Sequence, residues 1–97
     1  MSERYESLDP ILSTQVTLAM VSILMKVKQA DFQTLMEGTG TTQGNMSQQL
    51  KKLSDAGYLK VEKTYQNNYP YTICVITPKG RKVFEKYVED VKKYLSL

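Results

Sequence analysis

Residues 31–57 contain two helix start signals separated by a short glycine-containing segment, and no other feature constrains the fold as strongly. Asp31 is a favourable N-cap for a short helix. The inward residues of that helix are predicted to be Phe32, Leu35 and Met36. The glycines of residues 38–40 end it, and Thr41 or Thr42 caps the next helix. A short helix, a glycine-containing turn and a second helix form the sequence pattern of a helix-turn-helix unit.

The second helix of this unit has a clear apolar face and a clear polar face. Met46, Leu50 and Leu53 recur at helical spacing, and the helix is predicted to end before Gly57. A helix that enters the major groove of DNA needs short donors and acceptors near its start and basic residues near a phosphate strand. The candidate DNA-binding residues of this region are Thr41, Thr42, Gln43, Gly44, Asn45, Ser47, Gln48, Lys51 and Lys52.

The alternative interpretation of this polar face is an ordinary solvated surface. Such a surface usually mixes both signs of charge, whereas this face carries no acid before Asp55. Thr41 and Thr42 stand at the positive end of the helix, where hydroxyl and backbone N–H groups suit a phosphate. We therefore favour the DNA-binding interpretation.

Two runs with strand-like composition follow, at residues 59–65 and 71–77, with a polar turn at 66–70 between them. A last helix begins at Pro78. The order helix, helix, helix, strand, strand, helix predicts an α+β, mostly helical fold: a winged helix-turn-helix with a two-stranded β wing and a long C-terminal helix. The wing candidates for DNA contact are Lys63, Tyr65, Gln66, Asn67 and Asn68, with Tyr69 beside them at the tip. The alternative interpretation is that residues 66–70 form a turn and bind no ligand, since their composition is typical of turns. Arg81 is expected to reach a phosphate or to pair with an acid of its own chain.

The first and last helices, predicted at about residues 9–28 and 78–96, carry more apolar surface than the rest of a small domain covers. Asp9 and Pro10 give the first one a capped start. The surplus predicts that the two helices also meet a second copy of the chain. The residues assigned to this dimer interface are Leu12, Val16, Met20, Phe84, Tyr87, Val88, Val91, Tyr94 and Leu95. For Tyr87 and Tyr94, packing is favoured over ligand binding.

Composition excludes most catalytic and metal chemistry. The 97 residues suit one domain, spanning 1–97, and contain no histidine and one cysteine. A Cys/His zinc site cannot be built from them, and the commonest general base is missing. We expect no enzyme activity, no metal and no cofactor. Cys74 alternates in phase with Ile76, so a buried, small apolar role is favoured over redox sensing.

The chain is expected to be cytoplasmic. No apolar run is long enough to span a bilayer, and the acidic start at residues 1–6 does not resemble a signal peptide. The charge is uneven: residues 41–82 hold seven basic side chains against two acids, whereas residues 1–40 hold three against five. A basic middle third is the electrostatic pattern of a polyanion-binding face.

Six stretches together resemble the MarR-related winged-helix regulators of the short single-domain type. They are LDP at 8–10, DFQTL at 31–35, GNMS at 44–47, KLSDAGYL at 52–59, ITPKGR at 76–81 and FEKY at 84–87. The resemblance implies a homodimer that binds promoter DNA, usually as a repressor, with the terminal helices forming the dimer. Similar proteins commonly carry His and Arg where Ser13 and Thr17 stand here, so no role is transferred to these two positions.

The sequence thus predicts a sequence-specific regulator that binds double-stranded DNA and reads a pseudo-palindromic operator as a homodimer. The alternative is a winged-helix module for protein interaction whose basic face is incidental. A third reading is an RNA-binding wing. Nothing in the sequence indicates a small-molecule effector.

Overall fold

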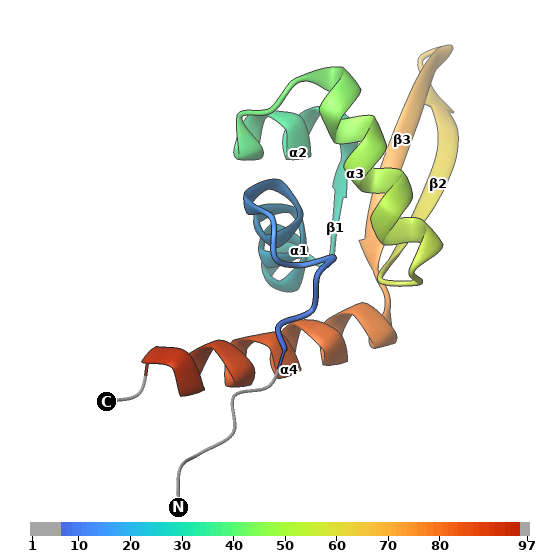
Figure 1. The fold of residues 1–97 in the computed structure, drawn as a ribbon. Helices are drawn as coiled ribbons and strands as arrows, with labels where there is room; N and C mark the ends of the chain where they lie inside the picture. The colour runs from blue at the N-terminus through green and yellow to red at the C-terminus, as the bar shows by residue number, and fades with distance from the viewer. Residues whose placement is uncertain (1–6, 96–97) are drawn as a thin grey trace, which may run out of the picture.

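The computed structural model describes residues 7–95 and places four helices around a small antiparallel sheet (Figure 1). In chain order the elements are α1 (Gln15–Val27), β1 (Gln29–Asp31), α2 (Phe32–Thr39), α3 (Gln43–Asp55), β2 (Leu59–Gln66), β3 (Tyr69–Ile76) and α4 (Pro78–Leu95). The wing extends past α2 and α3, and α4 crosses below α1 (Figure 1). Residue 96, the predicted end of the last helix, and residues 1–6 lie outside the described range. No helix within residues 7–95 has the length and apolar content needed to cross a membrane.

The first helix begins later than Asp9 and Pro10 suggest. The Asp9 carboxylate accepts the N–H of Ile11 at 2.7 Å, which closes a turn rather than a helix. Thr14 is the N-cap of α1 and accepts the N–H of Thr17. The buried Thr17 hydroxyl in turn donates to the carbonyl of Ile11 at 2.6 Å. A second capping residue therefore starts the helix, and the predicted start near residue 9 is wrong.

The sheet has a strand that the two-stranded prediction missed. β1 pairs antiparallel with β3, which places Ala30 opposite Cys74, and the strand order is β1-β3-β2. Three residues are too few for a periodic signal. Asp31, which ends β1, also carries the cap signal of α2, so the two signals overlap.

The turn of the wing is tighter than predicted. β2 and β3 pair from Leu59 opposite Ile76 to Gln66 opposite Tyr69, which leaves only Asn67 and Asn68 in the turn. Both have positive φ, 52° and 66°. Two left-handed residues form the turn that matches strand twist, and asparagine tolerates that conformation.

The core confirms the predicted rotation of the third helix. Met46, Leu50 and Leu53 are 0%, 7% and 0% exposed. They pack with buried residues of α1, α2 and the sheet, among them Val21, Leu24, Leu35, Leu59 and Ile76. Cys74 is buried as expected, and burial raises the pKa of its thiol to about 11.

The start of α4 packs directly on the corner between α3 and β2. The Thr77 hydroxyl donates to the carbonyl of Gly57 at 2.6 Å and accepts the N–H of Gly80 at 2.9 Å. A Cβ at Gly80 would overlap the backbone carbonyl of Tyr58. Because the obstacle is a backbone carbonyl and not the end of a flexible side chain, it cannot move aside for a side chain at residue 80.

Gly80→Ala should therefore lower the free energy of unfolding by about 1–3 kcal/mol, the usual cost of overpacking. Gly44→Ala is the matched control, because a Cβ at this helical position meets nothing within 4 Å. It should be neutral or slightly stabilising. Urea denaturation of both variants checks this, and equal midpoints would contradict the close approach of α4 to Tyr58.

Candidate nucleic-acid interface

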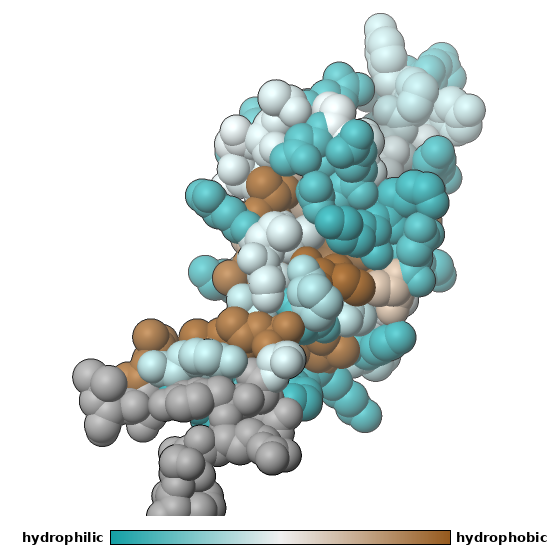
Figure 2. All heavy atoms as spheres, in the orientation of Figure 1, coloured by the Kyte–Doolittle hydropathy of each residue, from teal (hydrophilic) through white to brown (hydrophobic). Residues whose placement is uncertain are grey.

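Capping and burial fix how α3 is presented. The Thr42 hydroxyl accepts the N–H of Asn45 at 3.2 Å and so caps the helix, which settles the choice between Thr41 and Thr42. The buried face turns Gln43, Gly44, Ser47, Gln48, Lys51 and Lys52 outward, and all of these are exposed. Figure 2 shows hydrophilic side chains gathered over α3. These six predicted positions thus share one accessible face.

Asn45 lies on the flank of this face rather than at its centre. Its amide nitrogen donates to the Thr41 hydroxyl at 2.7 Å, and its amide oxygen accepts from Gln49 at 3.1 Å. Asn45, Thr41 and Gln49 are all half-buried. This chain of contacts holds the turn against the helix, which is a positioning role. Gln49 was not predicted, although its spacing of four residues from Asn45 is the signal for such a pair.

A groove of about 410 Å³ lies between α3 and the wing. Phe32, Leu50 and Val61 provide its apolar lining. Its polar lining is made by Gln43, Ser47, Lys51, Ser54, Asp55, Lys63 and Thr72. The groove brings predicted residues of the helix and the wing together, and it adds Ser54, Asp55 and Thr72, which the sequence analysis did not assign.

Lys51 has a partner inside this groove. Its ammonium lies 2.9 Å from the Asp55 carboxylate, and both side chains are largely exposed. The hydrogen bond to Asp55 raises the pKa of Lys51. The lysine therefore stays charged, but its charge is compensated by an acid four residues further along the helix.

The wing tip is aromatic and uncharged. Tyr65 and Tyr69 are 76% and 74% exposed. Tyr65 stands opposite Pro70, whereas Tyr69 stands opposite Gln66, so the two rings occupy opposite faces of the hairpin. Lys63, Gln66, Asn67 and Asn68 are also exposed. Tyr69, which was predicted to lie in the turn at the wing tip, is instead the first residue of β3.

Asp31 ties the wing to the start of α2. Its carboxylate accepts the N–H of Thr34 at 2.7 Å and the hydroxyl of Tyr71 at 3.0 Å. These hydrogen bonds hold the pKa of Asp31 below its usual value, and the bond from the Thr34 N–H has the largest effect. One carboxylate thus fixes a helix start and a wing strand together.

Arg81 is not brought to the groove. It is half-buried in the first turns of α4, and its guanidinium lies 3.8 Å from the sulfur of Met25 on α1. In this contact Arg81 packs α4 on α1 and does not pair with an acid within residues 7–95. Its contact with a phosphate stays a prediction.

The residues predicted for a dimer interface differ widely in burial. Leu12 and Met20 are 0% exposed, and Tyr87 is 8% exposed, so these side chains belong to the core of their own chain. Phe84, Val88, Val91 and Leu95 line a mostly apolar groove of about 320 Å³ with Leu18 of α1, and Tyr87 contributes to the same groove. Figure 2 shows apolar side chains along α4. Val16 is half-buried, and Tyr94 is 45% exposed.

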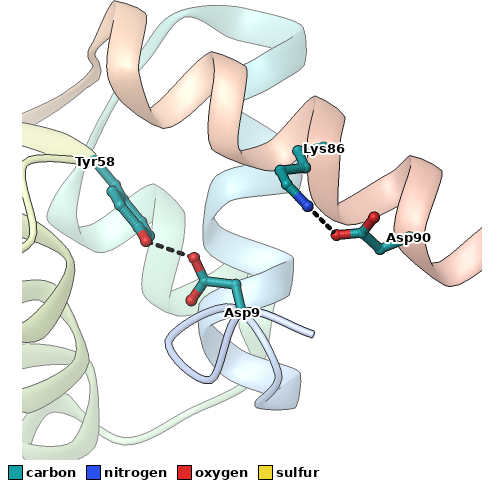
Figure 3. Close-up of polar contacts among 4 residues, drawn as sticks. All are labelled: Asp9, Tyr58, Lys86 and Asp90. Carbon is teal, nitrogen blue, oxygen red and sulfur yellow. Dashed lines mark hydrogen bonds and ion pairs between the residues drawn. The ribbon is translucent and has the colours of Figure 1, made fainter. Parts of the chain in front are cut away.

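The corner that ends α3 is also held from the N-terminal side. The Tyr58 hydroxyl donates to the Asp9 carboxylate at 2.5 Å, as Figure 3 shows. Burial, with help from the bond to Asp9, raises the pKa of Tyr58 to about 12. Nearby on α4, Lys86 pairs with the buried Asp90 at 2.8 Å (Figure 3). The hydrogen bond between Tyr58 and Asp9 links the turn at Asp9 to the end of α3, the helix that presents the candidate interface.

A capped, outward-facing third helix beside a β-hairpin defines the class of winged-helix DNA-binding proteins. A family model described as a winged helix DNA-binding domain matches residues 16–95, and the chain belongs to this family. It is 30% identical over 81 residues to the uncharacterized protein MJ0432 of Methanocaldococcus jannaschii, covering 84% of this chain and 88% of that one.

Solved structures place the fold among regulators of the MarR type. A transcriptional regulator homologue from Pyrococcus horikoshii superposes with a TM-score of 0.81 at 24% identity, covering 90% of this chain and 89% of that one. MarR itself gives a TM-score of 0.74 at 15% identity, covering 87% and 61%. BpsR of Bordetella bronchiseptica, whose DNA binding is regulated by 6-hydroxynicotinic acid, gives 0.74 at 15% identity, covering 89% and 64%. The fold of this chain is therefore the MarR-type winged-helix fold, and the chain spans about three fifths of the length of these two longer proteins.

The bond between Tyr58 and Asp9 predicts a specific pH response. The pKa of Tyr58 is raised in the folded protein, so its contribution to stability is complete below about pH 10 and is lost as the pH rises through about 12. Tyr58→Phe should lower the free energy of unfolding near pH 7 by about 1–2 kcal/mol. It should also flatten the loss of stability between these two pH values.

Urea denaturation across this pH range measures both effects. Tyr65→Phe removes a hydroxyl from an exposed ring and serves as the control. It should keep the wild-type stability and the wild-type pH profile. Identical profiles for the two variants would show that the Asp9 contact stabilises nothing.

Proposed function

We propose that this protein is a homodimeric, sequence-specific repressor that reads a pseudo-palindromic operator in double-stranded DNA through α3. The observation that supports it best is the outward face of α3, which is exposed along its whole length while Met46, Leu50 and Leu53 anchor the opposite side. A recognition surface must be both accessible and rigidly held, and this one meets both conditions.

The groups on this face suit distinct kinds of DNA contact. Near the start of α3, Gln43, Ser47 and Gln48 offer the donors and acceptors that match base edges in the major groove. Gly44 would let the backbone of α3 approach the DNA closely, since nothing in the protein lies within 4 Å of where a Cβ would stand. The N-terminus of α3, at Thr41 and Thr42, suits a phosphate.

Lysines and the wing complete the proposed interface. Lys51 and Lys52 lie further along α3, where a helix leaves the groove and meets the phosphate strand. Lys63 lines the same groove from the wing side, and from there it would approach the same phosphate strand. The wing tip would enter the neighbouring minor groove of the DNA. Because the tip is uncharged, it would fit that groove by its shape rather than by its charge. The residues of the tip are Tyr65, Gln66, Asn67, Asn68 and Tyr69.

Base reading predicts different behaviour for two neighbouring side chains. After selection of the preferred site from a random duplex pool, Gln48→Ala should weaken binding to that site by about 1–3 kcal/mol and leave random duplex almost unchanged. Lys52→Ala should weaken both by a similar factor, because phosphate contacts carry no sequence information. Fluorescence anisotropy at several salt concentrations measures both.

Two results would count against this proposal. Equal losses on selected and random duplex for Gln48→Ala would remove the base-reading role of this face. Negligible affinity of the wild type for any duplex, even at low salt, would favour a protein-interaction module instead.

The proposed dimer is supported by the apolar groove between α1 and α4. Leu95 is 71% exposed although it lines this groove, and in the single chain it contributes little to the core. A second copy would bury it together with Phe84, Val88 and Val91. Two recognition helices related by a two-fold axis would then read two half-sites one helical turn apart.

Leu95→Glu should separate the subunits without unfolding them. Placing a carboxylate in an apolar contact should raise the dissociation constant of the dimer by about 100-fold or more. Lys93→Glu introduces the same side chain at an exposed position of α4 outside the groove and should leave the dimer intact. Sedimentation equilibrium distinguishes one from two chains of 11.1 kDa. A monomeric wild type would contradict the dimer.

A further inference from the structure

The acid at the end of α3 is unexpected for a helix that faces DNA. Asp55 is the last residue of α3 and the only acid in that helix. A carboxylate at a helix C-terminus is opposed by the helix dipole. The order lysine first and acid four residues later is also the less favourable one for an ion pair on a helix. Local helix stability therefore does not account for this residue.

Its position in the fold is informative. Asp55 lines the groove between α3 and the wing, where Lys51 and Lys63 provide the positive charge. It accepts a hydrogen bond from Lys51 at 2.9 Å, and the two side chains are 66% and 75% exposed. An ion pair this exposed is weak and easily exchanged for another partner. Asp55 thus competes with an incoming phosphate for the lysine closest to it.

We propose that Asp55 is a specificity-determining residue that suppresses binding to random duplex and other polyanions. This inference rests on the proposed function. The Asp55 carboxylate accepts from one of the three N–H donors of the Lys51 ammonium group and leaves the other two for a phosphate. A phosphate at the position set by the base contacts of α3 meets those donors. A phosphate that approaches Lys51 from the side of Asp55 meets the carboxylate instead.

The energetics favour this difference between specific and non-specific DNA. Non-specific binding depends almost entirely on phosphate contacts, so the loss of one lysine and the addition of one repulsion affect it strongly. Specific binding adds contacts to base edges that hold the helix in one register. In that register the ion pair between Asp55 and Lys51 persists, and Asp55 stays at a fixed distance from the phosphates of the DNA strand.

Asp55→Asn tests the inference, since it removes the charge and keeps the shape. Its fold should survive, because the lost carboxylate opposes the helix dipole. We expect affinity for random duplex to rise about 3–10-fold and affinity for the selected site to rise less than about 2-fold. The slope of log K against log salt for random duplex should steepen by up to about 0.9, the value for one additional phosphate contact.

Glu89→Gln is the matched control. It removes one negative charge from α4, where Glu89 lies 3.5 Å from Lys92 in a comparably exposed pair. It should change both affinities slightly and equally. Lys51→Gln added to Asp55→Asn should abolish the gain on random duplex, because the gain depends on the released lysine.

Three outcomes would overturn the inference. Asp55→Asn behaving like Glu89→Gln would reduce the effect to net charge. A loss confined to the selected site would mean that Asp55 accepts a hydrogen bond from a base, as an acid does from cytosine. Absence of duplex binding by the wild type would remove the proposed function as well, and this failure is visible before any variant is made.

Discussion

The burial of Met46, Leu50 and Leu53 is the constraint on which the rest of the interface depends. These side chains fix the rotation of α3 about its axis, and successive residues of a helix turn by about 100°. A shift of one position would therefore bury Ser47 and expose apolar surface instead. The cap at Thr42 fixes the start of the helix in the same register. The direction in which each outward residue of α3 points therefore follows from which of its neighbours on the helix are buried.

The wing needs a separate set of constraints, because a two-stranded hairpin has little stability alone. β1 adds a third strand at the base, and Asp31 joins that strand to α2 and to Tyr71. At the other edge, Thr77 and Gly80 hold α4 against the backbone of Gly57 and Tyr58. The wing and α3 diverge from this corner, so its close packing sets the width of the groove between them.

Local signals were sufficient for the elements whose caps and apolar periods agree. Asp31, Thr42 and Pro78 each mark a helix start, and the predicted inward faces of α2 and α3 include the buried Leu35 and Met46. The predicted start of α1 is wrong because two capping residues, Asp9 and Thr14, lie only five residues apart, and sequence alone does not rank them. The MarR resemblance covered the fold as a whole but not such local choices.

Contacts between distant segments account for most of what the sequence could not supply. Arg81 reads as a candidate phosphate ligand from its charge alone, and only the packing of α4 on α1 places it beside Met25. Leu12 and Met20 read as part of an apolar surplus until the fold buries them completely. The strand β1 has too few residues to show a period. Each of these depends on partners far away in the sequence.

The charge of the interface bears on how such a protein would find its site. Each chain exposes four lysines on α3 and the wing, Lys51, Lys52, Lys60 and Lys63, and Lys51 is paired with Asp55. Lys60 and Lys63 are three residues apart on β2 and so point to opposite faces of the wing, which leaves Lys51, Lys52 and Lys63 on α3 and the groove side of the wing. Two chains would then neutralise about six phosphates at most, a modest number for a protein of this kind. The remaining affinity has to come from amide and hydroxyl contacts in the major groove and from the fit of the uncharged wing tip. Those contacts depend on base sequence and groove shape, so a sparse set of lysines favours selectivity over tight non-specific binding.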